Sequence, residues 1–340
     1  MTRELAPDPT ALFELATGFW ASATLLAAEE VGVFHVLTEA PRTASEAAQA
    51  LGADRRALER LLDACSGLNL LVKQGERYLL SPLAAAYLVP GAPGGLASGI
   101  AWARDQYAAW GRLAETVRTG RPAVDPGDHL GGDPEQARRF VLAMHERAAG
   151  IARAVVGSLN LDGVERLLDV GAGPGTYAVL LARRHPGLSA TLLDLPPILD
   201  AARELVDACG VAERIALRPG DASSGQYGEE AFDAVLFSGV LHQMPPETIR
   251  RMLEGAFRAL VPGGRVFLSD ILADATHTRP VFSALFSLQM LLTTEGGGVF
   301  SVEECRSWLE QAGFAEIEVQ RLPAPLPYTV VSALRPRALV

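Results

Sequence analysis

Residues 167–175 read LLDVGAGPG and lie between two apolar runs. The pattern predicts a buried strand ending at Val170, then a glycine turn and a helix that begins near Thr176. Glycines let the backbone approach a ligand closely, and a helix start offers unpaired N–H donors. The next apolar run, residues 189–193, ends at Asp194, whose carboxylate can accept both hydroxyls of a ribose. These two features together predict a nucleotide-type cofactor site.

The glycine spacing differs from the dinucleotide-binding fingerprint. The pattern G-x-G-x-x-G needs a third glycine at position 176, where this chain has Thr176. The chain instead has G-x-G-x-G, with Asp169 two positions before the first glycine. Taken singly, these glycines also fit a strand-to-helix turn that uses glycine only for packing.

The downstream spacing favours a cofactor site over packing alone. A strand over residues 214–218 precedes Gly220-Asp221, and a strand over 234–237 precedes the run from Ser238 to His242. A helix near 247–260, a turn over 260–264 and a strand over 265–269 follow. In this order the motifs resemble an S-adenosylmethionine-dependent methyltransferase of the Rossmann-like class I. The resemblance covers about residues 160–335 and implies an α/β fold.

The resemblance implies a set of residues that bind S-adenosyl-L-methionine. Two glycines line its amino-acid end, two residues after the second strand hold its ribose, and two after the third meet its adenine. We add Ser238, at the end of the fourth strand. The full set is Gly171, Gly173, Asp194, Leu195, Asp221, Ala222 and Ser238. For Asp221, a carboxylate that only caps a Gly-Asp turn is the alternative.

Composition limits the class of protein. The 340 residues include 30 basic and 40 acidic ones, for a net charge of −10, which disfavours binding to duplex DNA or to an anionic membrane. Three scattered cysteines suggest no disulfide framework and no zinc site. We find no signal peptide and no run of about 18 uncharged apolar residues, which a membrane span would need. We therefore expect a cytoplasmic protein.

The N-terminal segment predicts contact with a second chain. Residues 11–37 are predicted to be helical, with apolar side chains nearly all the way round. A helix without a polar face needs burial on more than one side, which a symmetric partner chain supplies. The alternative is the central helix of a single-chain bundle.

The next segments predict a winged helix. Thr43-Ala44-Ser45-Glu46 fits a helix cap, a second helix carries Leu58 to Leu68, and two short strands flank residues 74–76. Winged helices often bind DNA, and three arginines (Arg55, Arg56, Arg60) lie on this second helix. Residues 1–95, however, hold seven basic and eleven acidic residues, without the basic stripe of a DNA-binding module.

A winged-helix dimerisation domain joined to a methyltransferase domain resembles the O-methyltransferases of plant phenolics and bacterial aromatic polyketides. The resemblance implies an all-α/winged-helix dimerisation domain over residues 1–95, a helical linker over 96–158 and a methyltransferase domain over 159–340. It also implies a homodimer in which each N-terminal domain lends side chains to the partner's pocket, with Trp20 as a candidate.

The chemistry that this resemblance implies centres on His242. A histidine near neutral pH suits removal of a proton from a hydroxyl, and related enzymes have their base just past the fourth strand. The plant enzymes orient this base with a glutamate, but the register here gives Val299. Asp270 and Glu295 are therefore our two acidic candidates. Alternatively, His242 only positions the acceptor or caps an element.

We expect the acceptor to be a small, hydroxylated and largely apolar metabolite, with aromatic compounds favoured. The candidate substrate residues are Met144, His145, Phe286, Met290 and Trp20, although Phe286 and Met290 also fit a core stripe. One alternative is methylation of carbon or nitrogen on the same scaffold, in some cases with a metal. Another is a non-catalytic protein that binds a ligand or DNA.

Overall fold

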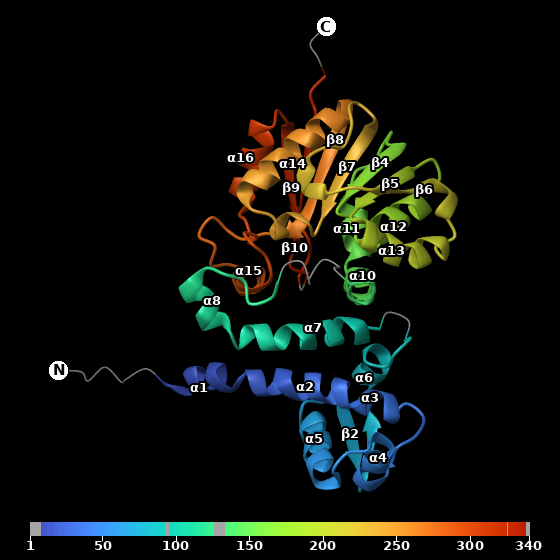
Figure 1. The fold of residues 1–340 in the computed structure, drawn as a ribbon, viewed down its shortest axis with the longest axis vertical. Helices are drawn as coiled ribbons and strands as arrows, with labels where there is room; N and C mark the ends of the chain where they lie inside the picture. Colours follow the sequence, from blue (N-terminus) through green and yellow to red (C-terminus); the bar gives the residue numbers. More distant parts are fainter. Residues whose placement is uncertain (1–7, 93–94, 126–132, 325, 338–340) are drawn as a thin grey trace, which may run out of the picture. The chain divides into compact units, whose positions relative to one another are not determined.

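A computed structural model describes residues 8–92, 95–125, 133–324 and 326–337. By its internal contacts the chain forms two compact units that divide after Asp105 (Figure 1). One long helix, α7 (Ala97–Trp110), runs across this division. The two units have separate hydrophobic cores.

The first unit packs short helices on a small antiparallel sheet with the strand order β1-β3-β2. Its core gathers apolar residues from α2 to α6 and from the two longer strands. The elements are α1 (Thr10–Thr17), α2 (Phe19–Val31), α3 (Val33–Val36), β1 (Arg42–Thr43), α4 (Ala44–Leu51), α5 (Arg55–Gly67), β2 (Leu71–Gln74), β3 (Arg77–Leu80) and α6 (Pro82–Tyr87).

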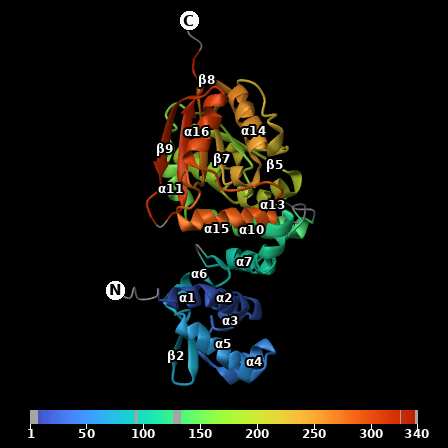
Figure 2. The same cartoon turned by 90° about the vertical axis from the view of Figure 1, so that its left-hand side faces the viewer.

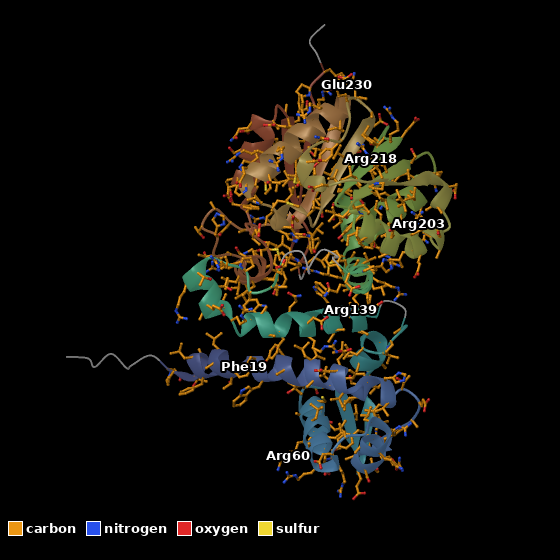
Figure 3. All side chains as sticks on the ribbon, in the orientation of Figure 1. Phe19, Arg60, Arg139, Arg203, Arg218 and Glu230 are labelled. Carbon is orange, nitrogen blue, oxygen red and sulfur yellow. The ribbon has the colours of Figure 1, made fainter. Side chains whose placement is uncertain are left out.

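This unit contains the helices and the hairpin of the predicted winged helix. Thr43 and Glu46 form a reciprocal capping box at the start of α4, as their spacing predicts. β2 and β3 pair as the hairpin, with Leu71 opposite Leu80. On α5 the side chain of Arg60 is exposed (Figure 3), and Arg55 pairs with Glu59 on the same helix.

The prediction of one continuous helix over residues 11–37 is wrong. Gly32 adopts φ = +87°, and its N–H caps the end of α2 by bonding to the carbonyls of Ala28 and Glu29. A left-handed glycine ends a helix at little steric cost, so α3 begins there as a separate turn. A second interruption, at Gly18, separates α1 from α2.

The stretch Thr10–Val31 is apolar and largely uncovered within its unit. Its 22 residues are long and apolar enough to cross a membrane by length and composition, and 11% of its most apolar window is buried. From the sequence we expect no run of about 18 uncharged apolar residues, and this stretch does contain charged residues such as Glu14 and Glu29. Its large side chains include Leu15, 79% exposed, and Phe19, 54% exposed and labelled in Figure 3. A surface of this kind indicates a covering partner.

The second unit is built around a seven-stranded sheet flanked by helices (Figures 1 and 2). Its strands are β4 (Arg166–Val170), β5 (Ser189–Asp194), β6 (Ile215–Pro219), β7 (Phe232–Ser238), β8 (Leu260–Ile271), β9 (Ala315–Arg321) and β10 (Tyr328–Leu334). Its α-helices after α7 are α8 (Leu113–Thr119), α10 (Pro134–Ala149), α11 (Ala152–Ser158), α12 (Thr176–Arg184), α13 (Pro196–Asp207), α14 (Pro246–Ala259), α15 (Val281–Thr293) and α16 (Val302–Gln311). Three single-turn helices are η1 (Ala212–Arg214), η2 (Ala222–Ser224) and η3 (Leu241–Gln243).

The strand order is β6-β5-β4-β7-β8-β10-β9; β6, β5, β4, β7 and β8 are parallel, and β10 is antiparallel to both of its neighbours, β8 and β9. Alternate residues of each inner strand face opposite cores. On β4, Leu167 packs with α11 and α12, whereas Leu168 packs with α14 and α16. The expected α/β fold with an N-terminal helical domain is confirmed.

One strand begins earlier than expected. We predicted a turn over residues 260–264, but β8 is continuous from Leu260, and its register with β7 shifts between Phe232 and Ala234. Gly263 adopts φ = +89°, so the Pro-Gly-Gly sequence forms an irregularity within the strand.

Helix α14 lies unusually close to the loop after η2, at a pair of glycines. A Cβ on Gly255 would lie 2.3 Å from the carbonyl oxygen of Gly225. This contact sets how closely α14 packs on its face of the sheet.

We expect Gly255→Ala to lower the free energy of unfolding by about 1–3 kcal/mol, because backbone atoms must move to admit the methyl group. Urea unfolding of the full chain measures this change. Gly157→Ala is the matched control, since a Cβ on that helical glycine has only one neighbour, at 3.9 Å. Equal stability of the two variants would contradict the close packing of α14.

Candidate active site

The predicted site residues gather where the parallel strands end. The chain runs from β4 outward to β5 and β6, then returns to place β7 on the other side of β4. In such sheets a crevice opens at the carboxyl ends of the two strands that flank this reversal. Residues 171–175 follow β4, and Ser238 and His242 lie at and after the end of β7.

Backbone hydrogen bonds fix these turns to the neighbouring strands. The N–H of Gly171 donates to the carbonyl of Leu193 at 2.8 Å. The N–H of Gly239 donates to the carbonyl of Ser269 at 2.9 Å. The turn after β4 is thereby held to the end of β5, and the loop after β7 is held to β8.

Two of the glycines after β4 are sterically required. Gly171 has φ = +67°, and a Cβ there would lie 2.5 Å from Val240. A Cβ on Gly175 would lie 2.5 Å from Leu192. Gly173 has φ = +53° but open space around its Cβ position. The turn therefore packs tightly at both ends and leaves room at its middle.

Asp194 joins the ends of β4 and β5. One carboxylate oxygen accepts from the N–H of Gly173 at 2.7 Å, and the other from the N–H of Leu195 at 2.7 Å. Burial raises the pKa of Asp194 to about 6, against the opposing effect of these two hydrogen bonds. The carboxylate is held firmly, and each oxygen retains a lone pair for a ligand hydroxyl.

Asp169 is a buried carboxyl group without a hydrogen-bond partner among the described residues. Neither of its oxygens, nor the hydroxyl oxygen of Ser238 on the adjacent strand, has a partner there. Burial and the nearby charge of Asp194 raise the pKa of Asp169 to about 7. Orphaned polar atoms at neighbouring strand ends fit the polar, cationic amino-acid part of the expected cofactor.

The structure gives Asp221 a local role. One of its carboxylate oxygens accepts from the N–H of Ser223 at 2.7 Å, and the other from the Ser223 hydroxyl at 2.8 Å. Its side chain thus caps η2, as in the alternative considered from the sequence. Ala222 is buried beside it.

The side chains of His242 and Asp270 form a short hydrogen bond at this end of the sheet. Nδ1 of His242 lies 2.6 Å from a carboxylate oxygen of Asp270, and the His242 backbone N–H reaches the other oxygen at 3.3 Å. The side chains are 11% and 3% exposed. Because a carboxylate only accepts, Nδ1 carries the proton of the neutral ring, and Nε2 keeps its lone pair.

Of the two acidic candidates, the structure brings Asp270 to His242. Glu295 is exposed, and among the described residues it makes no hydrogen bond to the histidine. The glycine run beside it packs on the histidine loop instead. The N–H of Gly298 donates to the carbonyl of His242 at 2.9 Å, and a Cβ on Gly297 would lie 2.3 Å from that oxygen.

Helix α15 supplies an aromatic wall beside His242. The ring of Phe286 meets the His242 ring edge to face at 4.9 Å, and Phe282 stacks on Phe286 at 6.0 Å. Met290, one turn further on, is buried in the sheet core. Gln289 ties this helix to α7 by accepting from the Trp110 indole N–H at 2.6 Å.

The other predicted substrate residues are on helix α10 or in the first unit. Nδ1 of His145 on α10 bonds to the Thr176 hydroxyl at 2.8 Å, and burial lowers the pKa of His145. Met144 beside it is half-buried. Trp20 belongs to the first unit, where it is 63% exposed.

Arg147 was not singled out from the sequence, yet it lies beside the aromatic wall. Its guanidinium carbon is 5.4 Å from the centre of the Phe286 ring. The spacing from Met144 was the available signal, since residues three apart share a helix face. Both views of the sheet place α10 and α15 at the same end (Figures 1 and 2).

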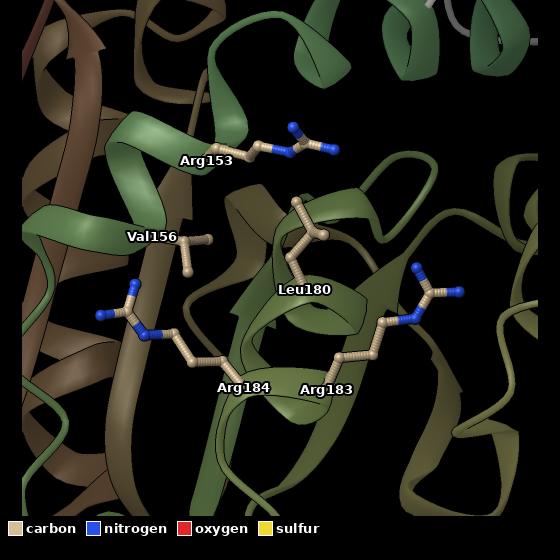
Figure 4. Close-up of a pocket in the computed structure, with 5 residues that line it drawn as sticks. All are labelled: Arg153, Val156, Leu180, Arg183 and Arg184. Carbon is tan, nitrogen blue, oxygen red and sulfur yellow. The ribbon is translucent and has the colours of Figure 1, made fainter. Parts of the chain in front are cut away.

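Two cavities are found beside helix α12, and the second also reaches the turn that follows β4. Between α11 and α12, a cavity of about 420 Å³ is lined by Arg153, Val156, Leu180, Arg183 and Arg184. Figure 4 shows Arg183 and Arg184 pointing to opposite sides. A second cavity, of about 260 Å³, includes His145 and Thr176. None of the predicted site residues lines the first cavity.

The described part of the chain contains no group of three or more histidine, cysteine, aspartate or glutamate side chains arranged to hold a metal ion. Its three cysteines are buried and unpaired.

Two family models match the chain. An O-methyltransferase domain matches residues 110–315, and an O-methyltransferase dimerisation domain matches residues 13–90.

Relatives match over nearly the full length. The 3-hydroxy-5-methyl-1-naphthoate 3-O-methyltransferase of Streptomyces sahachiroi is 36% identical, over 96% of this chain and 95% of its own. The tetracenomycin polyketide synthesis 8-O-methyl transferase of Streptomyces glaucescens is 30% identical, over 93% and 94%. Human N-acetylserotonin methyltransferase, solved in complex with S-adenosylmethionine, has a TM-score of 0.87 and 26% identity, over 98% of this chain and all of that one.

The raised pKa of Asp169 generates a prediction about stability without ligand. Folding raises the pKa of the Asp169 carboxyl from 3.8 to about 7. The folded protein therefore loses stability as the pH rises from the first of these pKa values to the second. We expect the stability gained by Asp169→Asn to grow by about 2 kcal/mol between pH 5.5 and pH 8.5. Thermal unfolding at several pH values measures this difference. A gain independent of pH would contradict the assignment.

Proposed function

Because the chain belongs to the O-methyltransferase family with an N-terminal dimerisation domain, and is an S-adenosylmethionine-dependent methyltransferase, we propose that it methylates a hydroxyl of a small aromatic acceptor with His242 as general base. The contact that carries this proposal is the 2.6 Å hydrogen bond from His242 Nδ1 to Asp270. It fixes the tautomer that a base requires.

The proposed roles follow from the geometry of the chain's own groups. S-adenosylmethionine supplies a methyl group that its sulfonium already activates. Nε2 of His242 takes the hydroxyl proton of the acceptor as the new O–C bond forms. Asp270 holds the imidazole in place and stabilises the imidazolium that results. Correct placement of the acceptor oxygen by the pocket walls contributes further to the rate.

We assign the cofactor to the crevice at the ends of β4, β5 and β7. Asp194 would accept the ribose hydroxyls with Leu195 beside it, while Gly171 and Gly173 leave space for the amino-acid end. The unpartnered oxygens of Asp169 and Ser238 support a polar ligand there.

For the adenine, we propose contact with Asp221 and Ala222. The Asp221 oxygens already accept from Ser223, so each would use its second lone pair.

The acceptor pocket that we propose lies against α10 and α15, with Phe286 and Met290 on one side and Met144 and His145 on the other. Among these four residues, Phe286 is the one whose ring contacts His242, and an aromatic side chain beside the base suits an aromatic acceptor. The names of two relatives, a 3-hydroxy-5-methyl-1-naphthoate 3-O-methyltransferase and a tetracenomycin polyketide synthesis 8-O-methyl transferase, support an aromatic acceptor.

We expect His242→Ala to lower kcat by about 10²-fold or more, since the proton then has no acceptor. Asp270→Asn should also lower kcat, because an amide holds the imidazolium less well than a carboxylate. Glu295→Gln is the comparison variant and should leave kcat near wild type. Transfer of labelled methyl from S-adenosylmethionine to a panel of phenolic acceptors measures all three.

Two results would redirect this assignment. Full activity of His242→Ala would mean that methyl transfer is driven by positioning alone. Label found on carbon or nitrogen of the product would keep the cofactor site but replace the hydroxyl acceptor.

We also propose a homodimer that covers the exposed apolar face of α1 and α2. Leu12, Phe13 and Leu15 are 70%, 68% and 79% exposed, which is unfavourable in a free monomer. A second copy of the same surface supplies the missing cover, and by analogy with the family Trp20 would border the partner's pocket.

We expect the double variant Leu15→Glu/Phe19→Glu to be monomeric, because the charges would be buried at the shared surface without partners. Sedimentation velocity of the full chain measures the change. Val72→Glu, on the exposed hairpin strand β2, is the matched control and should remain dimeric. A monomeric wild-type protein would refute the proposed interface.

A further inference from the structure

Arg147 is a cation beside the candidate pocket without a carboxylate partner in the described part of the chain. It is exposed, on the last turn of α10, and forms no ion pair with a described residue. Many other arginines of the second unit bind carboxylates or carbonyls, as Arg166 binds Asp233 at 2.8 Å. The charge of Arg147 is therefore available to an anion from outside the chain.

The surroundings hold the side chain of Arg147 against the pocket wall. Its guanidinium lies over Phe286. Burial raises the pKa of Tyr328, and the nearby charge of Arg147 opposes this rise. Its charge also acts on Tyr177, a second buried tyrosine. A ring face and a neutral hydroxyl orient a guanidinium without neutralising it.

Phe286 connects this cation to the proposed base. The centre of the Phe286 ring lies 4.9 Å from the centre of the His242 ring and 5.4 Å from the guanidinium carbon of Arg147. Phe286 thus contacts both the proposed base and the cation, so an acceptor whose hydroxyl reaches Nε2 of His242 is expected to present another substituent toward Arg147.

We propose that Arg147 binds a carboxylate of the acceptor, so that the enzyme methylates aromatic hydroxy acids in preference to their neutral analogues. This inference rests on the proposed function and names its substrate class. A planar guanidinium donates two parallel hydrogen bonds to a carboxylate. In a chain with a net charge of −10, an anionic acceptor needs such a local cation.

The test compares a hydroxynaphthoic acid with its carboxamide, which has the same shape without the charge. Binding is measured by calorimetry with the cofactor site saturated by S-adenosylhomocysteine, and methyl transfer is measured separately. We expect the acid to bind about 10- to 100-fold more tightly than the amide. Arg147→Gln should abolish this preference, and Arg147→Lys should restore part of it.

Arg153→Gln is the control, because Arg153 lines the separate cavity between α11 and α12 (Figure 4). It should keep the preference for the acid. In methyl transfer, Arg147→Gln should raise KM for the acid much more than it lowers kcat, since His242 is unchanged.

Three results would overturn the inference. They are equal binding of acid and amide by the wild type, failure of both to bind, and a loss of S-adenosylhomocysteine affinity in Arg147→Gln with no change in acid binding. Preference for the acid that depends on Arg147, with no label transferred to oxygen, would support the inference and count against the proposed function. Methylation of the amide as efficiently as the acid would do the reverse.

Discussion

The parallel pairing of β4 with β7 is the constraint on which the site depends. The order in which strands are added to the sheet changes side between these two strands, so the loops that follow them diverge and leave a crevice. The glycine turn after β4 fills one side, and the loop with His242 fills the other. A Cβ on Gly171 would clash with Val240 of that second loop, so the two loops pack closely only because residue 171 is glycine.

Much of this arrangement could be predicted from the sequence, because it follows from local patterns. Apolar runs and the glycine spacing located β4, β5 and β7, and Asp194 was placed at a strand end where it meets the glycine turn. The boundary of β8 was missed, since Gly263 reads as a turn signal but is absorbed within the strand. The break at Gly32 was missed because apolar periodicity continues through it.

The choice between Asp270 and Glu295 illustrates what sequence patterns leave open. Ser238 pairs with Ser269 across β7 and β8, so the residue after Ser269 lies next to the loop that follows β7. That adjacency depends on strand order and register, which a single sequence does not encode locally. Arg147 was missed for a related reason, since its neighbours Phe286 and Tyr328 come from distant segments.

The contact between Gly297 and the carbonyl of His242 has a consequence for how such enzymes diversify. This contact fixes the segment that follows α15 against the backbone of His242. The start of α15 remains exposed, since the side chains of Val281 and Leu285 are 68% and 50% exposed. Substitutions at the exposed start can reshape the acceptor wall while the histidine stays in register. The fold thus separates the end of the helix that is fixed to the base from an exposed end whose side chains can change without moving the base.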